Sequence, residues 1–128
     1  MRVVIDTNII VASLLSGEGG CRRFMTEVFG GAYEVVVSDS IIVEYERVLN
    51  YPKLDLHEAT VSMVLEWFRR NAIFVEVDDS QPVPEMDEKD PTDKKFYLLA
   101  RATRSLLVTG NIKHYPVEEW RTMIWELL

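Results

Sequence analysis

Short apolar runs, most of them rich in valine and isoleucine, alternate along this chain with segments of helical periodicity. The runs occupy residues 2–6, 33–37, 72–77 and 106–109. The first, RVVID, shows no apolar–polar alternation, which predicts a strand buried on both faces. Strands that alternate with helices predict a parallel sheet covered by helices on both sides. The expected fold class is therefore α/β, a doubly wound three-layer sandwich around a mostly parallel sheet of four to five strands.

The segments between the runs carry apolar residues at helical spacing. Helices are expected over residues 8–15, 21–29, 41–49, 56–68 and 96–103, and Pro52 stops the third of them. Trp67 and Phe68 in the fourth are interpreted as core or as part of a dimer face. Residues 123–127 are interpreted either as a fifth strand or as a terminal helical turn. Segment 78–90 carries two prolines and several acids, and most of its residues are expected to form a solvated loop.

The charge balance limits the functions that the chain can have. The length of 128 residues predicts a single domain, residues 1–128, and 14 basic against 21 acidic residues give a net charge of −7. That sign excludes a clamp that grips nucleic acid over a broad basic face, so a nucleic-acid contact must be local or must use bound cations. A single cysteine, Cys21, excludes a disulfide-built scaffold. The most apolar stretch, residues 3–15, is interrupted by polar residues, so we expect no membrane span, no signal peptide and a cytoplasmic protein.

Asp6 stands at the carboxyl end of the first expected strand, directly after Val3-Val4-Ile5. Ligands of open parallel sheets bind at that edge. A carboxylate buried there needs a partner, because burial of an unpaired charge costs several kcal/mol. Asp6 by itself fits two interpretations equally: an N-cap of the following helix, which the sequence Asp-Thr-Asn suits, and a ligand of a bound group.

A second acid is expected at the same edge. The sequence Asp90-Pro91-Thr92-Asp93 predicts a helix start, with Asp90 as N-cap, Pro91 at the first helical position and Asp93 reaching back as in a capping box. This places Asp93 in the first turn of a helix, near the sheet edge that carries Asp6.

Two further polar residues fall near that edge. Glu44 lies at the border of the apolar stripe of its expected helix, and the alternative is a surface glutamate paired with Arg47. Asn111 follows the fourth expected strand, and the alternative is an ordinary turn residue after Gly110.

Together these positions predict three carboxylates and an amide, from four segments, at one end of the sheet. Crowded carboxylates repel one another, and a divalent cation relieves that repulsion. Oxygen ligands without a cysteine or a pair of histidines select Mg²⁺ or Mn²⁺. Such sites serve phosphoryl chemistry, in which metal ions activate water and shield a phosphodiester.

The order of these segments resembles that of the PIN-domain ribonucleases. VVIDTNIIVASLLS resembles the first strand, acid and helix of that family, and SDSIIVEYERVL resembles its second acidic segment. DPTDKKFYLLA resembles the third motif, and LLVTGNIKHYP resembles the fourth strand and its end. The resemblance covers nearly the whole chain. It is strongest to the bacterial and archaeal toxin components of toxin–antitoxin systems (VapC-like).

The resemblance implies roles for particular residues. Asp6, Glu44 and Asp93 correspond to metal ligands, and Asn111 stands where many relatives have a fourth Asp, which completes the catalytic set. Thr109 and Asn8 are expected to hydrogen-bond to the ligand carboxylates. Because Asn111 removes one negative charge, a second metal is expected to bind weakly or to arrive with RNA.

The resemblance also implies a reaction and partners. The expected reaction is hydrolysis of single-stranded or looped RNA by metal-held water, which leaves 5′-phosphate and 3′-hydroxyl ends. The expected RNA contacts are Lys94, Lys95, Arg101 and Lys113, with Arg22 and Arg23 as further candidates. His114 is interpreted as a loop histidine and Tyr115 as a packing residue. A cognate antitoxin is expected, and large apolar residues on helices (Trp67, Phe68, Trp120 and Trp125) predict a homodimer.

Three alternatives remain at this stage. A catalytically silent PIN module is favoured by Asn111 and by the acidic charge balance. A haloacid-dehalogenase-type phosphatase needs a second Asp where this chain has Asn8. A phosphoacceptor receiver domain is supported by Asp78 and Asp79 after the third expected strand.

Overall fold

The centre of the molecule is a five-stranded parallel sheet, as a computed structural model shows for residues 1–127, with the side chain of Trp125 outside the description. The strand order is β3-β2-β1-β4-β5. The strands are β1 (Arg2–Ile5), β2 (Glu34–Val37), β3 (Ile73–Phe74), β4 (Leu106–Val108) and β5 (Arg121–Thr122). This sheet confirms the predicted α/β fold class and its parallel arrangement.

Strand β1 lies in the middle of the sheet and is buried on both faces, as its unbroken apolar run predicts. Val3, Val4 and Ile5 have no exposed surface. Val3 is in register with Val35 of β2 and with Leu106 of β4. The strand therefore delivers the next residue, Asp6, to the carboxyl edge of the sheet at its centre.

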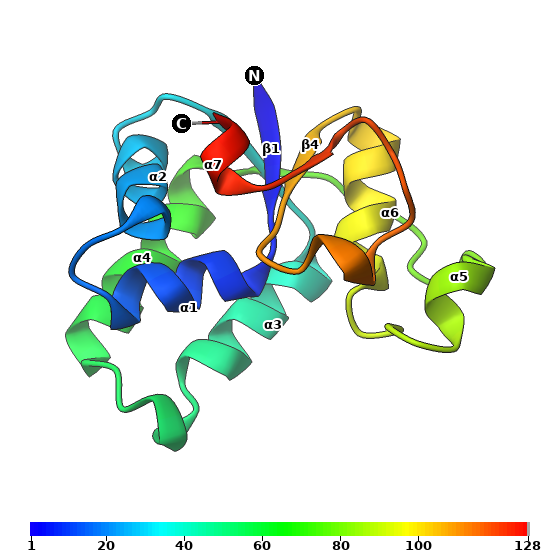
Figure 1. Cartoon of the computed structure of the whole chain (residues 1–128). Coiled ribbons are helices and arrows are strands. Elements are labelled where there is room, and N and C mark those ends of the chain that lie inside the picture. Colours follow the sequence, from blue (N-terminus) through cyan, green and yellow to red (C-terminus); the bar gives the residue numbers. More distant parts are fainter. Residues whose placement is uncertain (128) are drawn as a thin grey trace.

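Helices cover both sides of the sheet. They are α1 (Thr7–Leu15), α2 (Gly20–Phe29), α3 (Asp39–Leu49), α4 (Glu58–Asn71), α5 (Pro84–Asp87), α6 (Lys94–Thr103) and α7 (Ile124–Leu127), with 3₁₀ turns η1 (Pro52–Leu54) and η2 (Ile112–His114). Figure 1 shows α1, α2 and α4 on one side of β1 and α6 on the other, with α3 passing below the end of β1. Among the described residues no helix has both the length and the apolar character needed to cross a membrane.

Helix α3 forms because a polar cap precedes a long apolar stripe. The Ser38 hydroxyl accepts a hydrogen bond from the backbone N–H of Ile41 at 3.4 Å, which satisfies one of the free donors of the first turn. The stripe is buried through Tyr45 and Leu49, and the helix ends three residues before Pro52. On the neighbouring α4, Phe68 is fully buried and Trp67 packs edge-on against it, with ring centroids 5.3 Å apart.

The start of α6 differs from the prediction. The helix begins at Lys94, so residues 90–93 form a turn before it and Asp90 is not its N-cap. Asp93 occupies the cap position without a side-chain hydrogen bond to the helix. The reason is tertiary, since both acids face His114 instead of the backbone of α6.

The structure also resolves three other segments. Residues 123–127 are not a strand: β5 ends at Thr122 and α7 follows, which agrees with the helical-turn alternative. Strand β3 covers two residues of the expected 72–77 and is an exposed edge. Most residues of segment 78–90 are exposed, as expected, while Val83 and the fully buried Met86 anchor α5 in the core.

Candidate active site

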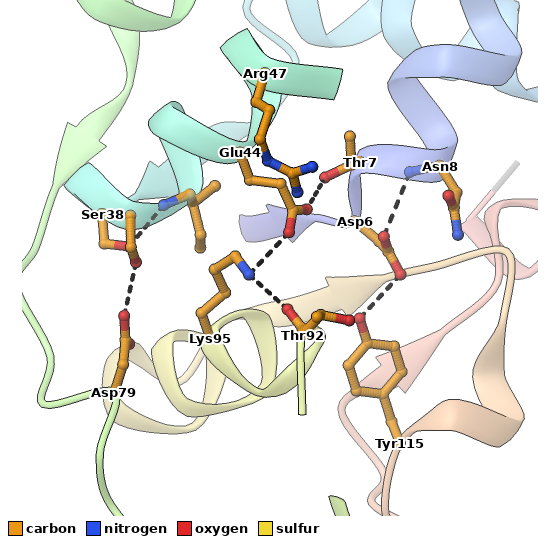
Figure 2. A network of polar contacts seen from close by, with 12 residues as sticks. Asp6, Thr7, Asn8, Ser38, Glu44, Arg47, Asp79, Thr92, Lys95 and Tyr115 are labelled. Carbon is orange, nitrogen blue, oxygen red and sulfur yellow. Dashed lines mark hydrogen bonds and ion pairs between the residues drawn. The ribbon is translucent and has the colours of Figure 1, made fainter. Parts of the chain in front are cut away.

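Asp6 is buried at the end of β1 and is held by hydroxyl groups. Only 2% of its surface is exposed. Its Oδ2 accepts hydrogen bonds from the Thr109 hydroxyl at 2.8 Å and from the Tyr115 hydroxyl at 2.9 Å. Its Oδ1 accepts a long hydrogen bond, 3.4 Å, from the backbone N–H of Asn8, which makes Asp6 the N-cap of α1 (Figure 2). The N-cap interpretation is therefore confirmed, and Oδ1 has capacity for a further partner besides the long bond from Asn8.

The environment of Asp6 disfavours the ionised form of its carboxyl group. Burial raises the pKa of Asp6 above its ordinary value of 3.8, and the charge of Asp93 raises it further. Hydrogen bonds from Thr109, Tyr115 and the Asn8 amide lower the same pKa. Because the net pKa is raised, the ionised carboxylate is held at a cost that a bound cation would relieve.

Tyr115 has a role that its position in the sequence does not indicate. It is 4% exposed and is therefore a packing residue, as expected, but its hydroxyl also donates to Asp6. Burial raises the pKa of Tyr115, and the charges of Asp6, Asp93 and Glu44 raise it further. All three acids therefore lie near this side chain, and the hydroxyl stays protonated and available as a donor.

Glu44 projects from α3 into the same edge and is 9% exposed. Its Oε2 accepts a hydrogen bond from the Thr7 hydroxyl, and its Oε1 lies 2.8 Å from Nζ of Lys95 on α6 (Figure 2). A surface glutamate paired with Arg47 is therefore the wrong interpretation. Glu44 is a buried carboxylate whose charge is neutralised by a lysine 51 positions later in the chain.

Asp93 belongs to a different local cluster. Nδ1 of His114 lies 3.0 Å from Oδ2 of Asp93 and 3.5 Å from Oδ1 of Asp90. Within residues 1–127, Asp90, Asp93 and His114 are the group of three ligand side chains whose atoms lie within 4.8 Å of one another. The hydrogen bond to Asp93 raises the pKa of His114. Asp6, Glu44 and Asp93 share one edge of the sheet, but their oxygens do not converge to that distance in the described structure.

The remaining expected site residues come from the ends of β1 and β4. The hydrogen bond expected of Thr109 is present, and the Thr109 hydroxyl also accepts from the backbone N–H of Asn111 at 2.9 Å. Asn111 is half-buried and caps η2 through the backbone turn that follows β4. Asn8 contacts Asp6 through its backbone, while its side chain is exposed.

Comparison with known protein families identifies the fold that carries this site. A family profile described as "PIN domain" matches residues 2–113, most of the chain. The chain belongs to the PIN domain family. No curated protein matches the sequence significantly. PIN domains are generally nucleases and typically bind divalent metals, and membership sets aside the phosphatase and receiver alternatives.

The donors of this PIN domain fit a hard divalent cation. The acids at this edge, Asp6, Glu44 and Asp93, carry carboxylate oxygens of the kind that Mg²⁺ and Mn²⁺ prefer. Oδ1 of Asp6 accepts only one long hydrogen bond within the described residues, so it has capacity for a further ligand. His114 adds a nitrogen ligand near Asp93, which suits Mn²⁺ better than Mg²⁺.

The basic residues expected to contact RNA have different surroundings. Lys94 pairs with Asp87 at 2.8 Å and Lys95 pairs with Glu44. Arg101 lies 5.4 Å above the ring of Tyr97, and Lys113 is exposed on η2. Of the two further candidates, Arg22 donates to the Ser13 carbonyl at 3.3 Å and Arg23 is exposed.

Proposed function

We propose that this chain, as a single domain of residues 1–128, is a metal-dependent ribonuclease that hydrolyses phosphodiester bonds in RNA and acts as the toxin of a toxin–antitoxin pair. The observation that carries this proposal is the position of Asp6. In this PIN-family sheet, the carboxylate at the end of the central strand is buried, the charge of Asp93 raises its pKa, and it forms no ion pair with a cation among the described residues. Such a group is suited to holding Mg²⁺ or Mn²⁺.

The proposed ligands are Asp6, Glu44 and Asp93, with Asn111 completing the catalytic set. When bound, the cation supplies a positive centre that activates water and shields the scissile phosphate. Thr109 and Tyr115 fix the orientation of Asp6 through two hydrogen bonds to Oδ2, which leaves Oδ1 with one long hydrogen bond from the Asn8 backbone. Thr7 fixes Glu44 in the same way.

RNA is the proposed substrate because basic side chains lie beside the carboxylates, although the chain as a whole is acidic. Lys94, Lys95 and Arg47 line a hollow that also contains Glu44. Arg101 and Lys113 are proposed as more distant phosphate contacts. A small group of basic side chains can bind a few phosphates of a single strand without a broad basic face.

The proposed partners are a cognate antitoxin and a second copy of the chain, and the proposed compartment is the cytoplasm, where RNA and such a partner meet. An apolar groove between α1, α2 and α4 supports association, because Met63 is 73% exposed beside Trp67 and Phe29. Light scattering at tens of micromolar tests the dimer: we expect twice the chain mass, and a strictly monomeric mass contradicts this part of the proposal.

A cleavage assay tests the main proposal. The wild-type protein is incubated with a panel of labelled single-stranded and hairpin RNAs, with Mg²⁺, with Mn²⁺ and with a chelator. We expect metal-dependent cleavage that leaves 5′-phosphate ends and that is absent in the Asp6→Asn variant. RNA binding without cleavage under every metal condition would instead favour a silent PIN module.

A further inference from the structure

Lys95 places a positive charge of the chain itself on one ligand of the proposed metal site. Its Nζ lies 2.8 Å from Oε1 of Glu44 and donates to the carbonyl oxygen of Thr92 at 2.5 Å. The Thr7 hydroxyl donates to the other oxygen of Glu44. Both oxygens of Glu44 therefore have partners, and Figure 2 shows the Lys95 ammonium between α3 and the turn before α6.

The pair holds Glu44 in a position where the three proposed ligands do not converge in the described structure. Glu44 lies outside the group of ligand atoms within 4.8 Å of one another, which contains Asp93. Ligand oxygens of one Mg²⁺ or Mn²⁺ ion bind at about 2.0–2.2 Å and so lie within about 4.5 Å of each other. One cation bound by Asp6, Glu44 and Asp93 together therefore requires at least one of these carboxylates to move, and Glu44 is the one that Lys95 holds in an ion pair.

The surroundings of Lys95 offer an alternative partner for its ammonium. The hollow beside Glu44 has a volume of about 370 Å³, and three cations line it: Arg47, Lys94 and Lys95. Lys94 is held by Asp87, while the side chain of Lys95 is 18% exposed and reaches the hollow. A phosphate of a nucleic-acid backbone fits this chemistry, and the flexible lysine stem allows the ammonium to move from a carboxylate to a phosphate.

We propose that Lys95 couples RNA binding to metal binding. Without RNA, the Lys95 ammonium neutralises Glu44 and the site holds a divalent cation weakly. A backbone phosphate of RNA takes the ammonium, and the released Glu44 carboxylate then binds the cation together with Asp6 and Asp93. This inference rests on the proposed function and adds its regulation. By linkage, the metal must strengthen RNA binding by the same factor as RNA strengthens metal binding.

Calorimetric titration with Mn²⁺ tests the coupling, with and without a short mixed-sequence single-stranded DNA that gel analysis shows to stay intact. We expect the DNA to raise the Mn²⁺ affinity of the wild type about tenfold. Lys95→Met is expected to bind Mn²⁺ about tenfold more tightly than the wild type without DNA, and to gain little when DNA is added. The same factor should appear when the DNA is titrated with and without Mn²⁺.

Two control variants separate this coupling from a general charge effect. Lys53 is exposed on η1, so Lys53→Met removes the same charge away from the site and should bind Mn²⁺ like the wild type. In a Glu44→Gln background, Lys95→Met should bring no gain, because no carboxylate is released. Lys95→Gln, which keeps hydrogen-bonding capacity without the charge, should reproduce the Lys95→Met result if the latter folds poorly.

The outcomes distinguish the inference from the proposed function. Equal Mn²⁺ affinities of the wild type and Lys95→Met, or a DNA effect that persists in the variant, would overturn the coupling. If the wild type still cleaves RNA with metal in that case, the proposed function stands. A wild-type protein that neither binds Mn²⁺ nor cleaves RNA would overturn both.

Discussion

The two buried carboxylates of the candidate site, Asp6 and Glu44, have different surroundings. Asp6, at the end of β1, is surrounded by neutral hydroxyl donors, and burial together with Asp93 raises its pKa. Glu44, on α3, has a lysine ammonium at 2.8 Å. One acid is oriented without being neutralised, and the other is neutralised by a side chain that can move away.

This difference indicates a division of labour. Hydroxyl groups from the residue after β4 and from the loop after η2 give Asp6 a fixed orientation, but they do not neutralise its charge, so under our proposal Asp6 relies on the metal ion for that. In the Glu44–Lys95 pair, each side chain neutralises the charge of the other. We therefore expect substitution of Asp6 to abolish cleavage. Substitution of Glu44 by Gln, which keeps the shape of the side chain, should show how much the charge of Glu44 contributes.

The largest effect is expected when the Asp6 side is neutralised. Asp6→Asn/Asp93→Asn should lower RNA cleavage by at least about three orders of magnitude, equivalent to about 4 kcal/mol of activation free energy. Mg²⁺ or Mn²⁺ should raise the melting temperature of the wild type, since the cation binds only the folded site, and the double variant should lose this rise. If the metal raises the melting temperature of the double variant as much as that of the wild type, the metal binds at a different site.

The same double variant should be more stable than the wild type without metal, and pH should control the difference. The pKa of Asp6 is raised in the folded protein, so folding stability is lost as the pH rises from about 3.8 through the raised value. The stability advantage of the variant should therefore be largest near neutral pH and shrink as the pH falls toward 3.8. Denaturant unfolding at several pH values measures it.

Glu44→Gln is expected to lower cleavage by about two orders of magnitude or more while the fold persists, equivalent to about 3 kcal/mol. The substitution keeps the shape of the side chain but removes its charge. Because Lys95 then lacks its ionic partner, we expect the unfolding free energy to fall by about 1–3 kcal/mol. Glu46→Gln is the matched control, because Glu46 pairs with Arg69 at 2.9 Å on the exposed face of α3. Equal loss of activity in both variants would indicate general damage.

Tyr115→Phe should have an intermediate effect. It removes one of the two hydroxyl donors to Oδ2 of Asp6, and we expect a loss of about tenfold to a hundredfold in cleavage rate. The Tyr115 hydrogen bond lowers the pKa of Asp6, so its removal should raise that pKa further and move the acid limb of the pH–rate profile to higher pH. A profile of unchanged shape would leave Tyr115 as a packing residue alone.

The smallest effect is expected at His114. Its hydrogen bond to Asp93 raises the pKa of His114 above 6.5, so its contribution to stability is complete below pH 6.5 and disappears as the pH rises through the raised value. The side chain is 45% exposed, and solvent screening keeps this contribution below about 1 kcal/mol. His114→Gln should therefore unfold slightly more easily at pH 6 and like the wild type at pH 9. The matched control is His57→Gln, which affects the N-cap of α4 and not the site.

Local sequence patterns were sufficient wherever an element is stabilised by its own neighbours. The apolar run before Asp6 predicts a central buried strand, and the stripe from Ile41 to Leu49 predicts α3 with Glu44 near its border. The start of α6 was predicted wrongly for the converse reason. Asp90 and Asp93 have good capping chemistry, but His114, more than 20 residues later, draws both carboxylates away from the helix.

The sequence by itself determined which acids reach the carboxyl edge, because the ends of parallel strands and the apolar faces of helices follow from periodicity over a few residues. The tertiary structure alone decided what each acid meets there. The partner of Glu44 lies 51 positions away in Lys95, and the hydroxyl of Tyr115 reaches Asp6 across 109 positions. Hydrogen bonds and ion pairs act over about 3 Å, whatever the separation along the chain, so the charge state and orientation of a buried carboxylate depend on packing that no local pattern encodes.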